Sequence, residues 1–124
     1  MVKVLIFILS LLISSQTVFA TPPVFTNSPE DAFILAKEIK LDILLVFGAK
    51  WCPACLVMKN DIHKDLSLVE NLIVCYVDFN DRPDMVKEYK VRQLPDYMIY
   101  KNNVETKRIT GYDSKEKFKE WISK

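Results

Sequence analysis

The chain has 124 residues, of which 17 are Lys or Arg and 16 are Asp or Glu. This balance of charge gives no reason to expect nucleic acid or an anionic membrane surface as a partner. The length suits one domain with a single hydrophobic core and is too short for two.

The first 20 residues follow the order of a secretory signal peptide. A positive start at Lys3 precedes an apolar run at 4–13, and Ala20 ends the segment with a small residue suited to signal peptidase. The run is shorter than the ~20 residues that span a bilayer, which argues against the alternative, an uncleaved membrane anchor. We therefore predict a cleaved signal peptide at 1–20, a domain at 21–124, and a location in the periplasm or outside the cell.

Helical and extended patterns alternate through the rest of the chain. The Pro-rich segment 21–26 is expected to be an extended lead-in, and Ser28 is expected to cap a helix that reaches about Lys40. An apolar run at 43–47 predicts a central strand, and a second helix is expected from about Pro53 to Asp65. The later predicted elements are a helical turn opened by Ser67, a strand at 72–79, a helix at 83–89, strands at 97–101 and 104–110 joined by a tight turn at Asn102 and Asn103, and a helix capped by Ser114.

This order of elements predicts the fold class. Strands crossed by helices and followed by an antiparallel hairpin form a mixed sheet with helices on both faces. We therefore predict an α/β domain with three layers, α/β/α.

Three cysteines carry the candidate chemistry. Cys52 and Cys55 are separated by two residues, between the strand at 43–47 and the following helix. A zinc site would need further ligands, yet His63 is the only histidine and Cys75 the only other cysteine, so we expect no metal. A purely structural disulfide would close too small a loop to stabilise the fold much. We interpret the pair as a working thiol–disulfide site.

The position of each thiol predicts its role. Cys52, at the helix N-terminus, is expected to be the more exposed and more acidic thiol and therefore the attacking nucleophile. Cys55, one turn inside the helix, would resolve the mixed disulfide and release the partner. Trp51 and Pro53 would frame the reactive sulfur with apolar surface. The redox-active disulfide between the two cysteines is the working group, and we expect no other cofactor.

The sequence WCPAC at 51–55 resembles the active centre of the thioredoxin family. Leu94 and Pro95 stand where that family places its cis-proline, and Gly111 follows the hairpin at the spacing of the family. The resemblance covers 21–124 and implies a thioredoxin-like fold and a thiol–disulfide oxidoreductase. Parts of 58–69 and 109–112 most resemble the C-terminal domain of the DsbD-type reductase and small exported thioredoxin-like proteins. The resemblance places the substrate-binding surface at Trp51, Pro53, Leu94 and Pro95.

Several positions depart from the pattern of the family. Val46 stands where a buried aspartate is usual, so Cys55 lacks an obvious base; Gly48 replaces an aromatic residue and Asn60 a proline. Asp96 follows Pro95 where threonine is usual. It either approaches Cys52 and raises the pKa of that thiol, or is a solvated turn residue, which we favour.

Three further residues have a plain interpretation and a functional one. Cys75 is expected to be a buried small hydrophobic residue, with a second redox partner or an intermolecular link as the alternative. His63 is expected to be an exposed helix residue rather than a catalyst. Lys50 is a surface charge unless it lies near Cys52, where it would favour the thiolate.

The two residues between the cysteines bear on the direction of electron flow. Pro53 and Ala54 offer the Cys52 thiolate no cation or extra donor, which favours a reductant or isomerase over an oxidase. We expect a monomer that reduces disulfide-bearing exported proteins and takes electrons from a membrane donor of DsbD type. The alternatives are a disulfide-forming oxidase and a non-enzymatic binding or chaperone module with a vestigial cysteine pair.

Overall fold

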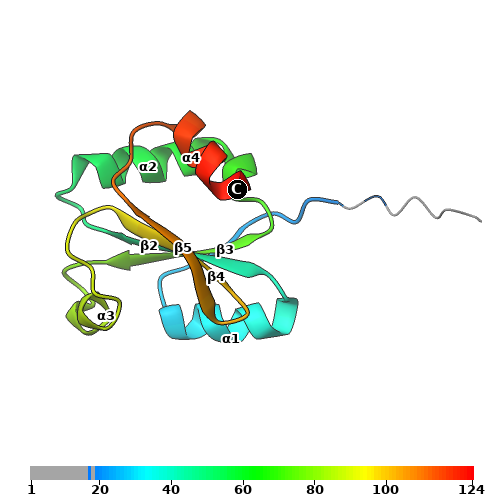
Figure 1. Ribbon diagram of the computed structural model, residues 1–124, viewed down its shortest axis with the longest axis horizontal. Helices are drawn as coiled ribbons and strands as arrows, with labels where there is room; N and C mark the ends of the chain where they lie inside the picture. The colour runs from blue at the N-terminus through cyan, green and yellow to red at the C-terminus, as the bar shows by residue number, and fades with distance from the viewer. Residues whose placement is uncertain (1–16, 18) are drawn as a thin grey trace, which may run out of the picture.

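The computed structural model describes residue 17 and residues 19–124. A five-stranded sheet lies between two layers of helices, with α2 and α4 on one face and α1 and α3 on the other (Figure 1). The predicted three-layer α/β/α fold is confirmed. The predicted signal peptide falls almost wholly outside the described residues and stays a prediction.

Ten elements make up this part of the chain. In chain order they are β1 Val24–Thr26, α1 Pro29–Ile39, β2 Asp42–Gly48, α2 Pro53–Lys64, the 3₁₀ turn η1 Leu66–Val69, β3 Leu72–Asp78, α3 Pro83–Glu88, β4 Asp96–Lys101, β5 Val104–Thr110 and α4 Lys115–Ser123. None of the helices among the described residues has the length and hydrophobicity that crossing a bilayer requires.

The sheet is mixed, with the strand order β1-β3-β2-β4-β5. β1, β3 and β2 are parallel, and β4 and β5 are antiparallel to their neighbours. The predicted extended lead-in at 21–26 is extended in the structure, and its pairing with β3 as β1, with Val24 opposite Ile73, was not predicted. A strand of three residues that follows two prolines shows no alternating pattern of its own, and only the edge of β3 supplies its backbone partners.

Side chains of β2 alternate between the two cores. Leu44 and Val46 pack toward α2 and α4, whereas Ile43, Leu45 and Phe47 pack toward α1 and α3. All five are buried, so β2 is covered on both faces as an uninterrupted apolar strand should be. This rigid central strand carries the segment that follows it, residues 49–52, to one end of the sheet.

Short sequence signals determine where most of the helices and turns begin or end. The hydroxyls of Ser28 and Ser114 accept hydrogen bonds from backbone N–H groups in the first turns of α1 and α4, as predicted. Asn102 and Asn103 have positive φ angles of 50° and 63° in the β4–β5 turn. The predicted cap at Ser67 is wrong: Asp65 caps η1, because its carboxylate accepts the N–H of Ser67.

Candidate active site

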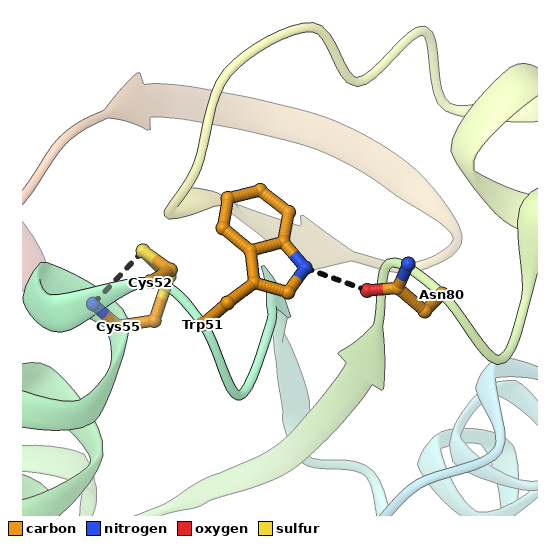
Figure 2. The surroundings of a disulfide bond; sticks show 4 residues. All are labelled: Trp51, Cys52, Cys55 and Asn80. Carbon is orange, nitrogen blue, oxygen red and sulfur yellow. Dashed lines mark hydrogen bonds between the residues drawn. A yellow bond between two sulfur atoms is a disulfide. The ribbon is translucent and has the colours of Figure 1, made fainter.

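The cysteine pair lies where β2 gives way to α2. Cys52 is the N-cap of α2, and its Sγ accepts a hydrogen bond of 3.2 Å from the backbone N–H of Cys55 (Figure 2). Pro53 occupies the first turn of α2, where backbone N–H groups have no partner within the helix, so the N–H that proline lacks costs no hydrogen bond. Cys52 and Cys55 form a disulfide with a Cα–Cα distance of 5.3 Å. The helix N-terminus therefore presents its free N–H groups and partial positive charge to the sulfur of Cys52.

Both cysteines are buried in the disulfide form. Cys52 is 6% exposed and Cys55 is 9% exposed, so the expected greater exposure of Cys52 is not found. The physical reason is that both cysteines pack with Ala49 in a small cluster that Leu94 and Phe79 cover in part. A partner that reaches the pair must therefore contact this apolar surface.

Trp51 forms one wall of this surface. Its side chain is 63% exposed, yet it is held in place, because its indole N–H donates to Oδ1 of Asn80 at 2.8 Å (Figure 2). Phe79 packs against the indole edge to face, with ring centroids 6.3 Å apart. Sequence analysis missed Phe79 and Asn80, since nothing in the sequence links them to Trp51 before the end of β3 is folded beside it.

Leu94 forms a second wall, and Pro95, the next residue, is buried. The Leu94–Pro95 peptide bond is cis, as the resemblance implied, and Leu94 packs against the cluster that contains Cys52. The carbonyl of Pro95 accepts the N–H of Gly111, whose φ of +89° suits a residue without a side chain. Trp51, Leu94 and the exposed Pro53 thus lie around the cysteine pair, and their role in binding a substrate stays a prediction.

Asp96 does not match its favoured prediction. It is 3% exposed rather than solvated, and it forms an ion pair with the guanidinium of Arg108 on the neighbouring strand. The pair is strengthened by a hydrogen bond from the hydroxyl of Thr110, and the bonds to Asp96 raise the pKa of Arg108. Asp96 lies on the face of β4 that carries Met98, which packs toward α1 and α3. Its charge is therefore neutralised on the face of the sheet opposite α2.

The remaining candidates take structural positions. Cys75 is fully buried beneath α1 and α3, which confirms the prediction of a buried small hydrophobic residue, and desolvation raises the pKa of its thiol to about 12. His63 is exposed on α2, as predicted, and stacks on Phe25 of β1 with centroids 4.8 Å apart. Lys50 is exposed and lines a pocket that also reaches Cys55. Within residues 19–124, no cluster of three or more His, Cys, Asp or Glu side chains could hold a metal ion.

The family follows from comparison with known proteins. A family model described as Thioredoxin matches residues 26–124. The chain belongs to the thioredoxin family. Thioredoxin of Rickettsia felis is 29% identical over 90 residues, which are 70% of this chain and 84% of that protein. Thioredoxin H-type of Fagopyrum esculentum is 31% identical over 81 residues, which are 65% of this chain and 70% of that protein.

Solved structures of thioredoxins share the fold. A thioredoxin of Nicotiana alata, 20% identical, aligns with a TM-score of 0.68 over 85% of this chain and 93% of its own. Trxlp of Edwardsiella tarda, 23% identical, aligns with a TM-score of 0.68 over 80% of this chain and 97% of its own. At these identities the likeness establishes the fold.

Membership in the family defines the chemistry of the pair. Thioredoxins are thiol–disulfide oxidoreductases that act on disulfide-bearing proteins through a redox-active disulfide and without a cofactor. The chain carries the matching CxxC pair at the matching place, the N-terminus of α2. It is therefore a thiol–disulfide oxidoreductase of the thioredoxin family.

Proposed function

We propose that this thioredoxin-family protein reduces or isomerises disulfides of other proteins outside the cytoplasm. The observation that carries the proposal is the Cys52–Cys55 disulfide at the N-terminus of α2, framed by Trp51 and Leu94. Dithiol–disulfide exchange requires one stabilised thiolate, a second thiol within bonding distance and a surface that a polypeptide can cover. Each of these has a matching feature in the fold.

Cys52 acts as the nucleophile in this proposal. In the reduced protein, the N–H of Cys55 and the N-terminus of α2 stabilise a negative charge on its Sγ. The thiolate attacks one sulfur of the substrate disulfide, and the other sulfur leaves as a thiol after taking up a proton. Cys55 then attacks Sγ of Cys52, which re-forms the Cys52–Cys55 bond and releases the second substrate thiol. The substrate disulfide gains the two electrons that the dithiol loses.

The substrate binds across the apolar surface around the pair. Trp51 is a fixed, exposed platform on one side, Pro53 is exposed at the start of α2, and the half-buried Leu94 lies on the other side, before the buried Pro95. An extended polypeptide with a disulfide would cover Trp51, Pro53 and Leu94 and gain by burying them. The lack of a charged group among them suits a broad range of substrates.

The reducing direction is supported by the residues between the cysteines. Pro53 and Ala54 add no cation or side-chain donor near Sγ of Cys52, so the thiolate is stabilised less than in a strong oxidant. Equilibration with mixtures of reduced and oxidised glutathione measures the reduction potential. We expect a potential well below the ~−120 mV of DsbA, and a value near it would overturn the reducing direction in favour of a disulfide-forming oxidase.

The location outside the cytoplasm is supported by residues 1–20, which have the order of a cleaved signal peptide. A reductase there needs electrons from across the membrane, and we infer a membrane donor of DsbD type, in line with the sequence resemblance at 58–69 and 109–112. Cell fractionation with N-terminal sequencing of the purified protein tests this. We expect a chain that begins near Thr21 in the extracytoplasmic fraction; a full-length cytoplasmic chain would exclude it.

A further inference from the structure

A pocket of about 440 Å³ lies between β2, β3 and α2 and reaches Cys55. Gly48 opens it toward the sulfur: a Cβ at this position would lie 3.4 Å from Cβ of Cys55 and 3.5 Å from its Sγ. A space of this volume holds several water molecules, since each takes ~30 Å³ in the liquid. One side of Cys55 therefore faces a space that water can enter, although the residue is only 9% exposed.

Cys55 must lose its proton in order to react, and water beside its sulfur can carry that proton away. A thiol attacks a disulfide as its thiolate, and burial in apolar surroundings favours the protonated form. The neighbouring residue on β2, Val46, is 4% exposed and has no group that can take a proton. The pocket that reaches Cys55 is therefore the place where a proton acceptor for its thiol can lie.

Asp78 places a carboxylate in this pocket. It is the partner of Gly48 in the parallel β2–β3 ladder, and residues paired in this way project to the same face of a sheet. Oδ1 accepts the N–H groups of Asn80 at 2.8 Å and Asp81 at 3.3 Å, which fixes the side chain. No side chain or backbone donor in residues 19–124 bonds to Oδ2, so this oxygen is open to pocket water.

We propose that Asp78 is the general base of the resolving step, taking the proton of Cys55 through pocket water. This inference rests on the roles given to Cys52 and Cys55 under the proposed function. The S–H bond of Cys55 breaks as water hands a proton to Oδ2 of Asp78. The new thiolate attacks Sγ of Cys52, the bond from Cys52 to the substrate sulfur breaks, and that sulfur leaves with the electron pair. The departing thiolate then takes up the proton that Asp78 held.

Other charged and titratable groups line the same pocket. Lys59 lies one turn after Cys55 on α2, with its Nζ 4.9 Å from the ring centroid of Tyr76, and Lys50 lies in the loop before Cys52. Burial raises the pKa of Tyr76, so its hydroxyl stays protonated and cannot serve as a base. Arg82 is engaged by two carboxylates, and Asp81 is exposed at the rim. Asp78 is thus the half-buried carboxylate of the pocket.

Asp78→Asn tests the proposal, because the amide keeps an Oδ1 acceptor for the turn and removes only the base. The reduced protein is mixed with the neutral disulfide dithiodipyridine, which releases one coloured thione when Cys52 attacks and a second when Cys55 resolves. We expect the second release to slow about tenfold at neutral pH, with the first unchanged. Asp81→Asn, in the same pocket, is the matched control and should leave both rates unchanged.

The direction of the change in the second release distinguishes a general base at Asp78 from a negative charge that only acts on the pKa of Cys55. If Asp78 acted only as a nearby negative charge, its removal would lower the pKa of Cys55 and speed the second release. A faster or unchanged second release therefore overturns the proposal. Absence of the first release in the parent protein would instead overturn the role of Cys52.

Gly48→Ala provides a second variant should Asp78→Asn fold poorly. The added methyl group is in ordinary van der Waals contact with Cys55 and separates its sulfur from the pocket water. We expect it to slow the second release by itself, while Asp78 stays in place. A second release as fast as in the parent protein would contradict a proton path through this pocket.

Discussion

Asp96 is a buried carboxylate whose negative charge is neutralised by one cation, the guanidinium of Arg108. Removing that partner leaves an uncompensated, buried negative charge on the face of the sheet that α1 and α3 cover. We expect Arg108→Met to lower the free energy of unfolding by ~3 kcal/mol, as measured by urea denaturation. The double variant Asp96→Asn with Arg108→Met should recover most of the loss. Equal losses in the single and double variants would show that the aliphatic stem of Arg108, rather than its charge, is what matters.

Cys75 makes stability depend on pH in the alkaline range. Its pKa is raised to about 12 by burial, whereas the unfolded thiol ionises near pH 9. The protonated Cys75 thiol therefore contributes its full stabilisation below about pH 9. As the pH rises toward 12, the free energy of unfolding falls by ~1.4 kcal/mol per pH unit. Urea denaturation between about pH 9 and 10 should show a steeper loss in the parent protein than in Cys75→Ala, because the ionisation of the unfolded tyrosines near pH 10 affects both proteins equally. Parallel curves for the two proteins would contradict it.

At the scale of elements, α4 is tied to the sheet through its C-terminal end. Nζ of Lys107 on β5 donates to the carbonyl oxygens of Trp121 and Ile122 and lies 4.9 Å from the centroid of the Trp121 ring. A cation at this end complements the helix dipole and satisfies carbonyls that have no partner within the helix. We expect Lys107→Met to cost ~1 kcal/mol of stability and to speed amide exchange in the last turn of α4. Lys119→Met, an exposed change on the same helix, is the control and should do neither.

Features that depend on neighbouring residues could be predicted from the sequence, whereas contacts between distant segments could not. The caps at Ser28 and Ser114, the turn at Asn102 and the CxxC pair depend on neighbours a few residues away, and all were predicted. β1, the Asp96–Arg108 pair and the Trp51–Asn80 bond join segments that are distant along the chain. No local pattern marks either partner in such contacts. For the same reason the sequence offered no base for Cys55, since Asp78 comes near it only through the pairing of β2 with β3.

The whole molecule can be tested for catalysis against the alternative of a binding module with a vestigial pair. We expect the protein to accelerate the reduction of insulin by dithiothreitol, followed as turbidity, because the fold positions both cysteines at the start of α2. Cys52→Ser should abolish the acceleration, while Cys75→Ser, remote from the pair on the other face of the sheet, should keep it if it folds. Equal turbidity with and without the protein would favour the binding module.

The clasp between Thr21 and Asn71 sets where a tether could be attached to this domain. The N–H of Thr21 donates to Oδ1 of Asn71, and the N–H of Asn71 donates back to the carbonyl of Thr21. Asn71 precedes β3, whereas the disulfide follows the opposite end of β2, which runs parallel to it. In Figure 1 the N-terminal segment accordingly leaves the sheet at the end away from the β2–α2 connection. An immobilising linker or reporter fused ahead of Thr21 would therefore hold the domain with its cysteines facing outward, free to meet large substrates.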